Sequence, residues 1–245
     1  MKAVILAAGV NNRLKMLAKD IPKCLLKIGK TTILDSQIKM LTSIGNLRLH
    51  DIYVVGGYKI EKLCYLKDMG VHVVYNPKFE EFNNIYSFYL AKNFVDEDFI
   101  LFNGDTLGDK RIFEALVASD YETAFVVDNV KKLGWEEMKV LVRDDRILRF
   151  GKEIDPKIAH GEYIGFAKFS LRDAIVIFDC MEKLLGEGKT DIWYENGINY
   201  VLDKIDAFTV FTNGLPWIEI DTPMDYERAI KETYLQISNG ESARH

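Results

Sequence analysis

The sequence predicts an α/β fold built on a mixed, mostly parallel sheet. Apolar runs alternate with amphipathic segments in a β-α-β-α-β order, which is typical of parallel strands joined by helices. Lys2 to Leu6 and Asp51 to Gly57 are nearly continuous apolar runs, as expected of strands buried on both faces. With 245 residues, 48% of them hydrophobic, the chain can form a sizeable core.

Hydrophobic spacing defines the elements of the first half. Apolar residues between Thr31 and Ile44 recur at helical spacing, and Gly45 follows as the helix end. An aromatic helix is expected after Asn76, running to Ala91. The other elements predicted here are strand 25–28, strand 51–57, helix 60–69, strand 71–75 and strand 98–102.

The second half is less regular. Asp144 and Asp145 predict a hairpin turn inside a small antiparallel insertion at about residues 122–170. The predicted elements are strands 122–129, 139–142, 146–150 and 161–170, helices 171–185 and 192–203, strands 208–212 and 217–221, and helix 224–236. Residues 1–237 are expected to form one domain, followed by a frayed tail at 238–245.

Composition excludes several classes of protein. A net charge of -5 and a pI of about 5.5 argue against a broad surface for nucleic acid or anionic membrane. Cys24, Cys64 and Cys180 are widely spaced in apolar surroundings, which favours reduced thiols over disulfides or a metal site. The chain has no cleavable signal pattern and no apolar run near the ~20 residues of a membrane span. We therefore expect a cytoplasmic protein without nucleic-acid or membrane partners.

The first loop, after Leu6, has the composition of a nucleotide cradle. Ala7, Ala8 and Gly9 have almost no side chain, so a base or a phosphate can lie against the backbone. Arg13 and Lys23 then supply positive charge for phosphate. The alternative is an ordinary strand and turn with solvated charges.

Two familiar phosphate motifs are excluded by counting. The dinucleotide fingerprint requires glycines where Asn11 and Leu14 stand. A Walker A loop ending at Ile28 to Thr32 would place its first glycine at Cys24.

Three groups of polar residues lie at the start of a helix, after a strand or along a strand. Asn84 and Ser87 lie at the entrance of the aromatic helix, where they serve either as caps or as contacts to a base. Asp105, on the turn after strand 98–102, suits Mg²⁺ held by one carboxylate and substrate phosphates, or else it stabilises the turn. Strand alternation places Glu219 and Asp221 on one face.

These residues together resemble the nucleotidyltransferase family with the GT-A-type fold, over essentially the whole chain. The first loop is similar to the family signature G-x-G-x-R, with Asn11 in place of the second glycine. The clusters at 83–87, 103–105 and 219–223 resemble the cytidylyltransferases that act on phosphocholine, aminoethylphosphonate and inositol phosphate. The resemblance implies a Rossmann-like three-layer sandwich and a CTP-dependent reaction that releases pyrophosphate.

The resemblance also implies roles for these residues. Lys23 would stabilise the α-phosphate and Arg13 the leaving pyrophosphate, while Asp105 would hold Mg²⁺ with Asp221, or with Glu219 as second choice. The CTP-binding residues it implies are Leu6, Ala7, Ala8, Gly9, Asn12, Arg13, Lys23, Gly57, Asn84, Ser87, Gly104 and Asp105. The product would be an activated precursor for a surface polymer or a lipid. A homodimer is left open.

The acceptor is expected to contact the antiparallel insertion and the segment near Trp193. The predicted acceptor-binding residues are Lys139, Lys152, Glu162, Lys168 and Trp193. Trp135 and Tyr194 would complete an aromatic wall suited to a cationic head group. Solvated strand charges and core aromatics are the alternatives.

Two further functions remain open at this stage. One is a sugar-1-phosphate nucleotidyltransferase that uses UTP, dTTP or GTP. The other is a nucleotide-binding regulatory module without catalysis, against which the presence of Arg13, Lys23, Asp105 and Asp221 argues.

Overall fold

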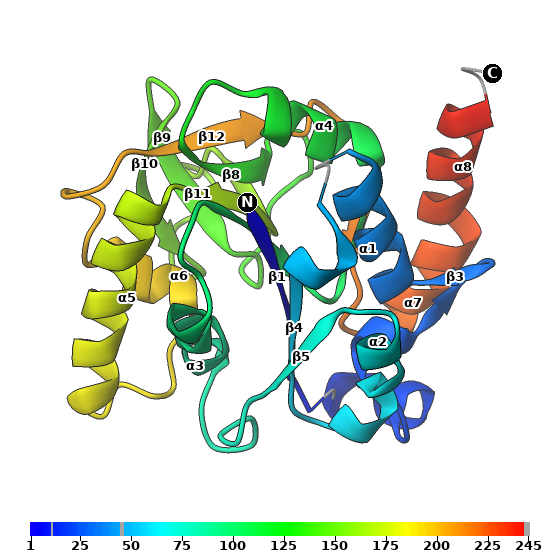
Figure 1. Ribbon diagram of the computed structural model, residues 1–245. Coiled ribbons are helices and arrows are strands. Elements are labelled where there is room, and N and C mark those ends of the chain that lie inside the picture. The colour runs from blue at the N-terminus through cyan, green and yellow to red at the C-terminus, as the bar shows by residue number, and fades with distance from the viewer. Residues whose placement is uncertain (11, 45–46, 243–245) are drawn as a thin grey trace.

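The computed structural model describes residues 1–10, 12–44 and 47–242 (Figure 1). Asn11 and Gly45, on which two predictions depend, lie outside the described residues, as do 243–245. The described residues form a nine-stranded sheet in the order β5-β4-β1-β6-β11-β8-β12-β10-β9. Its strands are β1 (Lys2–Ala7), β4 (Ile52–Gly56), β5 (His72–Tyr75), β6 (Phe99–Asn103), β8 (Thr123–Asp128), β9 (Lys139–Arg143), β10 (Arg146–Gly151), β11 (Gly161–Phe169) and β12 (Ala207–Phe211).

The sheet is mixed, as predicted, but it contains more antiparallel pairing than expected. β5, β4, β1 and β6 pair in parallel, and so do β8 and β12. β11 runs antiparallel between β6 and β8, and β10 runs antiparallel to both β12 and β9. The long strand β11 therefore joins the predicted insertion to the main sheet.

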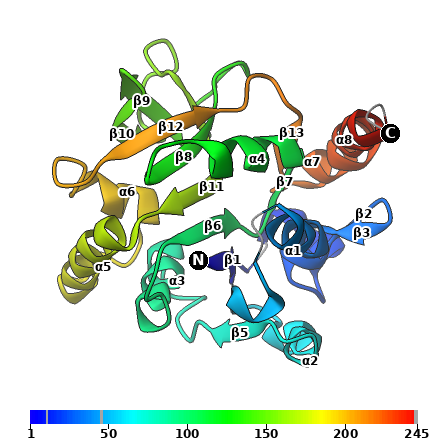
Figure 2. The ribbon, with the colours of Figure 1, turned by 45° about the horizontal axis from the view of Figure 1, so that its top comes forward.

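Helices cover both faces of the sheet (Figures 1 and 2). Alternate residues of β1 enter two separate cores: Val4 packs with the side that carries α3, α5 and α6, and Ile5 packs with the side that carries α1, α2 and α4. The bounds are α1 (Ile33–Ser43), α2 (Tyr65–Asp68), α3 (Asn84–Tyr89), α4 (Lys110–Ala118), α5 (Leu171–Gly186) and α6 (Tyr194–Asn199). α4 was not predicted, although Asp109 caps it and Ile112, Phe113 and Leu116 line one face.

Two predicted helices differ from the observed ones: one is broken, and the other is longer than predicted. The segment predicted as helix 60–69 is a 3₁₀ turn, Ile60–Leu63, followed by one turn of α2. The C-terminal helix is longer than predicted: α7 (Pro223–Arg228) continues through a π-helical turn (Ala229–Thr233) into α8 (Tyr234–Ser242). The predicted frayed tail is thus helical as far as it is described.

Two small strand pairs complete the frame near the first loop. β7 (Thr106–Gly108) pairs with β13 (Trp217–Glu219), and β2 (Lys27–Ile28) pairs with β3 (Thr31–Thr32). Figure 2 shows β7 and β13 between the main sheet and α7. This pairing places Glu219 opposite Thr106, shortly after the end of β6.

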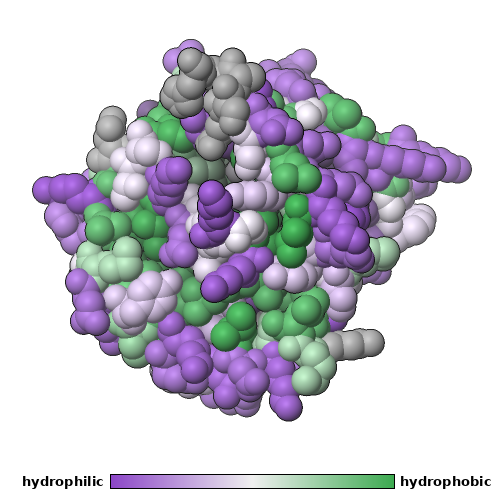
Figure 3. Space-filling view, turned by 90° about the vertical axis from the view of Figure 1, so that its right-hand side faces the viewer, coloured by the Kyte–Doolittle hydropathy of each residue, from purple (hydrophilic) through white to green (hydrophobic). Residues whose placement is uncertain are grey.

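The face that carries α8 is shown in Figure 3, where hydrophobic residues appear in groups separated by hydrophilic ones. No helix among the described residues is long and apolar enough to cross a membrane.

Candidate active site

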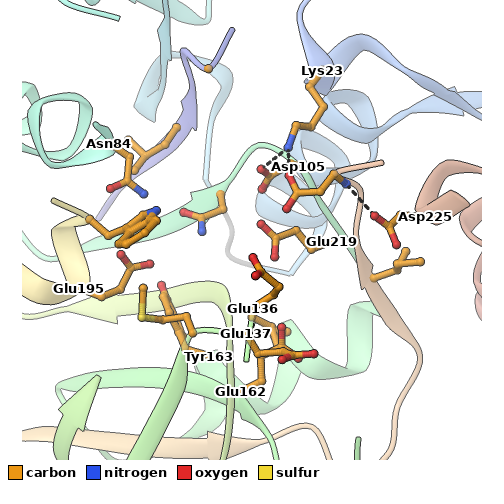
Figure 4. Close-up of a pocket in the computed structure, with 18 of the residues that line it drawn as sticks. Lys23, Asn84, Asp105, Glu136, Glu137, Glu162, Tyr163, Glu195, Glu219 and Asp225 are labelled. Atoms are coloured by element: carbon orange, nitrogen blue, oxygen red, sulfur yellow. Dashed lines mark hydrogen bonds and ion pairs between the residues drawn. The ribbon is translucent and has the colours of Figure 1, made fainter. Parts of the chain in front are cut away.

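A cavity of about 900 Å³ opens at the carboxyl ends of β1 and β6, where the sequence predicted the ligand (Figure 4). A smaller one of about 270 Å³ lies against the first loop and shares Arg13, Lys23, Asp105 and Asp221 with it. The two cavities therefore meet at a cluster of opposite charges.

Lys23 is the centre of this cluster. Its Nζ donates to Asp105 Oδ2 at 2.8 Å and to Asp221 Oδ1 at 2.6 Å. Arg13 Nη2 reaches the other oxygen of Asp221 at 2.5 Å. Pro22 precedes the 3₁₀ turn that Lys23 begins (Lys23–Leu25) and fixes the direction of the chain there.

The acidic residues of the cluster are held by the β7–β13 pair and by α7. Glu219 pairs with Thr106, and Ile220 N donates to Asp105 O at 3.0 Å. The capping box of α7 holds the next residues, because Asp225 accepts from the backbone of Thr222 at 2.9 Å and of Asp221 at 3.3 Å. Pro223 at the first turn suits this helix start.

Asp105, Glu219 and Asp221 can hold a divalent cation. One carboxylate oxygen from each lies within 4.8 Å of the others. Asp105 Oδ1 is buried and has no hydrogen-bond partner among the described residues. Three carboxylates with an orphaned oxygen match the oxygen ligands that Mg²⁺ takes, so the residues fit such an ion.

The proximity of these charges shifts their pKa values. Burial would lower the pKa of Lys23, but the Asp105 and Asp221 carboxylates outweigh it and raise that pKa. Desolvation by the groups around Glu219 raises its pKa, although the residue is exposed at the cavity, and repulsion from Asp105 and Asp221 adds to the increase. Burial also opposes ionisation of Asp221, yet Lys23 and Arg13 lower its pKa overall. In the free cluster, the cations Lys23 and Arg13 therefore favour the ionised form of Asp221, whereas the neighbouring carboxylates disfavour that of Glu219.

The structure brings together most residues predicted for the nucleotide. Leu6, Ala8, Gly9, Arg13, Lys23, Asn84, Ser87 and Asp105 line the larger cavity, and Ala7, Asn12 and Gly104 line the smaller one. Gly57 lines neither cavity. A Cβ there would lie 2.7 Å from Ala8 O and closer still to Phe79, so this glycine allows the first loop to pack.

Asn84 and Ser87 are tied to neighbouring elements. Asn84 Oδ1 accepts from Tyr194 N at 2.9 Å, which leaves its amide hydrogens for other acceptors. Ser87 is buried and accepts from Asn76 Nδ2 at 2.8 Å. Asn83, and not Asn84, is the N-cap of α3.

Of the predicted acceptor residues, Lys152, Glu162 and Trp193 line the larger cavity, and Lys139 and Lys168 do not. Lys139 is fully buried, and its Nζ donates to the Trp135 and Glu137 carbonyls at 3.2 and 3.1 Å. Lys168 lies toward the far end of β11 and donates to Ser119 O at 2.7 Å. The structure therefore places neither lysine in the cavity with the other predicted acceptor residues.

The predicted aromatic wall is also incomplete. Trp193 contributes to it, with Lys152 Nζ 4.7 Å from its ring centroid. Trp135 does not line the cavity, and Tyr194 is buried, with its hydroxyl 3.2 Å from Asn103 Oδ1 and 2.9 Å from the Tyr163 hydroxyl.

Sequence reasoning missed an acidic wall on the side away from Lys23. Glu136, Glu137 and Glu195 line the larger cavity with Glu162 (Figure 4). Lys131 donates to Glu162 at 2.9 Å. Burial raises the pKa of Glu162, against the lowering effect of Lys131. In the sequence, the acidic residues at 136, 137 and 162 are the only signal that could have indicated this wall.

Comparisons with known proteins agree with this geometry. A family model described as MobA-like NTP transferase domain matches residues 3–161. The chain is 27% identical to a choline-phosphate cytidylyltransferase of Streptococcus pneumoniae, over 93% of this chain and 96% of that protein. It is 28% identical to a CTP:phosphoglutamine cytidylyltransferase of Campylobacter jejuni, over 95% and 100%.

Solved structures show the same likeness. The CTP:phosphocholine cytidylyltransferase structure from Streptococcus pneumoniae matches with a TM-score of 0.77 at 25% identity, covering 93% of this chain and 96% of that one. The inositol-1-phosphate CTP transferase of T. maritima also gives 0.77, at 24% identity, with coverage of 98% and 96%. At 24% identity, the likeness to the T. maritima enzyme shows a shared fold.

Proposed function

The chain belongs to the MobA-like NTP transferase family and is a nucleotidyltransferase, and from this premise we propose that it is a cytidylyltransferase. It transfers CMP from CTP to a small phosphorylated or phosphonate acceptor and releases pyrophosphate. The choice of CTP is supported by the named activities of the relatives, which use it. The activated product serves surface polymer or lipid synthesis.

The observation that carries the proposal is the bridge from Lys23 to Asp105 and Asp221 at the junction of two cavities. A phosphate that enters this junction meets both Lys23 and Arg13. Since each cation is held by a carboxylate in the free protein, its position is fixed before the nucleotide arrives, which reduces the reorganisation that the reaction requires.

The reaction needs positioning more than proton transfer. An oxygen of the acceptor phosphate attacks the α-phosphorus of CTP, a new P–O bond forms, and the bond between the α-phosphorus and the bridging oxygen of pyrophosphate breaks. The attacking oxygen is already anionic at neutral pH, so no general base is required. Lys23 stabilises the charge on the α-phosphate, and Arg13 binds the departing phosphates.

Asp105 and Asp221, with Glu219 beside them, would hold the Mg²⁺ ion. The ion would neutralise phosphate charge and orient the two substrates. Asp221 is the first choice beside Asp105, although it is also the partner of Arg13 and Lys23. An ion bound by Asp221 would therefore share this carboxylate with Lys23 and Arg13.

The test is pyrophosphate release with Mg²⁺, offering CTP, UTP, dTTP, ATP and GTP in turn. The acceptor pool contains phosphocholine, aminoethylphosphonate, phosphorylated amino acids, polyol phosphates and sugar 1-phosphates. We expect CTP alone to respond and EDTA to abolish the response. Turnover of UTP, dTTP or GTP with a sugar 1-phosphate would favour the alternative enzyme. Nucleotide binding without any turnover would favour a regulatory module.

A further inference from the structure

Glu195 is a buried carboxylate with one oxygen that lacks a hydrogen-bond donor. It lies in the first turn of α6, is 3% exposed, and lines the larger cavity. Its Oε2 has no hydrogen-bond partner among the residues that the structure describes. Buried polar groups in proteins are nearly always paired, so a carboxylate oxygen left unpaired beside a cavity indicates a missing ligand.

The neighbours of Glu195 cannot make up the deficit. The backbone N–H of Glu195 and the Tyr194 hydroxyl both hydrogen-bond to this carboxylate, yet Oε2 stays unpaired, and the Tyr194 hydroxyl also lies 3.2 Å from Asn103 Oδ1 and 2.9 Å from the Tyr163 hydroxyl. A tyrosine hydroxyl has a single proton to donate, so Tyr194 can donate to at most one of the two carboxylate oxygens. The terminal torsion of a glutamate is soft, so rotation exchanges its two oxygens without adding a donor.

Among the described residues, no nearby cation forms an ion pair with Glu195 within 4 Å. Lys131 donates to Glu162 and lies 3.9 Å from Glu137, so it serves two other acids of the same wall. Lys152 lowers the pKa of Glu195 only from a distance, because its Nζ lies over the Trp193 ring. The same lysine also lowers the pKa of Asp221, which places it electrostatically between the acidic wall and the metal-binding residues.

We propose that Glu195 determines acceptor specificity by accepting a hydrogen bond from a protonated primary amine on the acceptor. The inference rests on the proposed function, since it concerns the acceptor of that reaction. Figure 4 shows Glu195 across the cavity from Lys23, Asp105 and Glu219. A molecule with a phosphate at one end and an ammonium at the other has its phosphate toward Lys152 and Lys23 and its ammonium toward Glu195.

A quaternary ammonium fits this arrangement less well. A trimethylammonium group has no N–H to donate to Glu195, so it would leave the Oε2 atom of Glu195 unpaired. The usual partner of such a group is an aromatic face, and Lys152 already occupies a face of Trp193 at 4.7 Å. A neutral hydroxyl can donate but does not balance the charge of the wall. Burial raises the pKa of Glu195 to about 7, which agrees with a carboxylate that lacks its counter-ion.

The test removes N–H donors one at a time while keeping the charge. We would compare 2-aminoethyl phosphate with its N-methyl, N,N-dimethyl and N,N,N-trimethyl derivatives, add 2-hydroxyethyl phosphate, and repeat the set on a three-carbon chain. The wild type should prefer the primary amine to the trimethyl compound about ten- to a hundredfold in kcat/KM. Glu195→Gln should lose most of that preference, with the KM for CTP unchanged.

Glu153→Gln is the matched control, because Glu153 follows Lys152 but pairs with Arg149 at 2.7 Å and does not line the cavity. Its preference should equal that of the wild type. An equal or better trimethyl acceptor, an unchanged preference in Glu195→Gln, or a change in the KM for CTP would overturn the proposal.

Binding is measured beside turnover, as the Tm shift given by each phosphate with a non-reacting CTP analogue. A greater shift with the primary amine supports the inference even if no member turns over, and that lack of turnover would then count against the proposed function. Equal shifts, or no shift with any member, would overturn the inference.

Discussion

Lys23 Nζ donates to Asp221 Oδ1 at 2.6 Å, joining the first loop to a residue that lies 198 positions later in the chain. The same ammonium binds Asp105, so it lies between two of the three carboxylates that can hold a metal. A divalent cation held by these carboxylates would therefore compete with Lys23 for the same negative charge. In the free protein Lys23 pairs with both acids, and a metal ion held by them would leave the ammonium available to a phosphate.

Replacing Lys23 by methionine tests this competition. Lys23→Met leaves the half-buried Asp105 without its cation and Asp221 with Arg13 alone, so we expect the free energy of unfolding in EDTA to fall by about 1–3 kcal/mol, less than for a fully buried pair. Mg²⁺ or Mn²⁺ should then raise its Tm more than that of the wild type, while kcat falls at least ~10²-fold. Thermal unfolding and pyrophosphate release measure both effects.

Lys231→Met provides the comparison, because Lys231 forms an exposed pair with Glu227 that contributes little to stability. It should behave as the wild type toward metal. If Lys23→Met gained no extra stabilisation from metal, Lys23 and the ion would not share these carboxylates.

Asn84 is predicted to distinguish cytosine from uracil. Its oxygen is held by Tyr194 N, so its amide can donate to the N3 and O2 acceptors of cytosine. Asn84→Asp keeps the acceptor for Tyr194 and removes the donor, so the ratio of kcat/KM for CTP to that for UTP should fall about 10–100-fold. An unchanged ratio with an unchanged Tm would limit Asn84 to its contact with α6.

The charged centre could be predicted from the sequence because its residues lie next to strong local signals. Lys23 follows a proline, Asp105 follows a buried strand, and Asp221 precedes a capping box. The parallel strands at the start of the chain were predictable for the same reason, since each is a buried apolar run. Residues 103–105 and 219–221 come together only through the β7–β13 pair, whose strands are too short to predict.

The acceptor side depends on tertiary structure that local patterns do not contain. Glu162 and Lys168 are six positions apart on β11, which corresponds to about 20 Å along a strand. A change of register between Tyr163 and Ala167, with Gly165 at a φ of +85°, further separates their surroundings. Glu195 carries no local signal, because its burial depends on how α6 packs.

The roles of Lys152 and Lys168 can be distinguished experimentally. Lys152→Met removes a cavity cation without an ion-pair partner within 4 Å among the described residues, so we expect the KM for the acceptor to rise about tenfold with little change in the KM for CTP. Lys168→Met, whose ammonium contacts Ser119, should leave both constants unchanged. Steady-state kinetics on the best acceptor measures the KM for the acceptor and the KM for CTP in each variant. Equal effects of the two changes would contradict the placement of Lys168 outside the site.

Glu195 should make the stability of the free protein depend on pH. Burial raises its pKa from about 4.5 to about 7, so between these values the folded state keeps a proton that the unfolded state has lost. The free energy of unfolding should therefore fall as pH rises from 4.5 to 7, by up to about 3 kcal/mol from this group. Glu195→Gln does not titrate, so its stability relative to the wild type should increase over this range, whereas Glu153→Gln should run parallel to the wild type. Urea unfolding at several pH values measures the difference, and a constant offset between Glu195→Gln and the wild type would show that Glu195 is ionised throughout and already has a counter-ion.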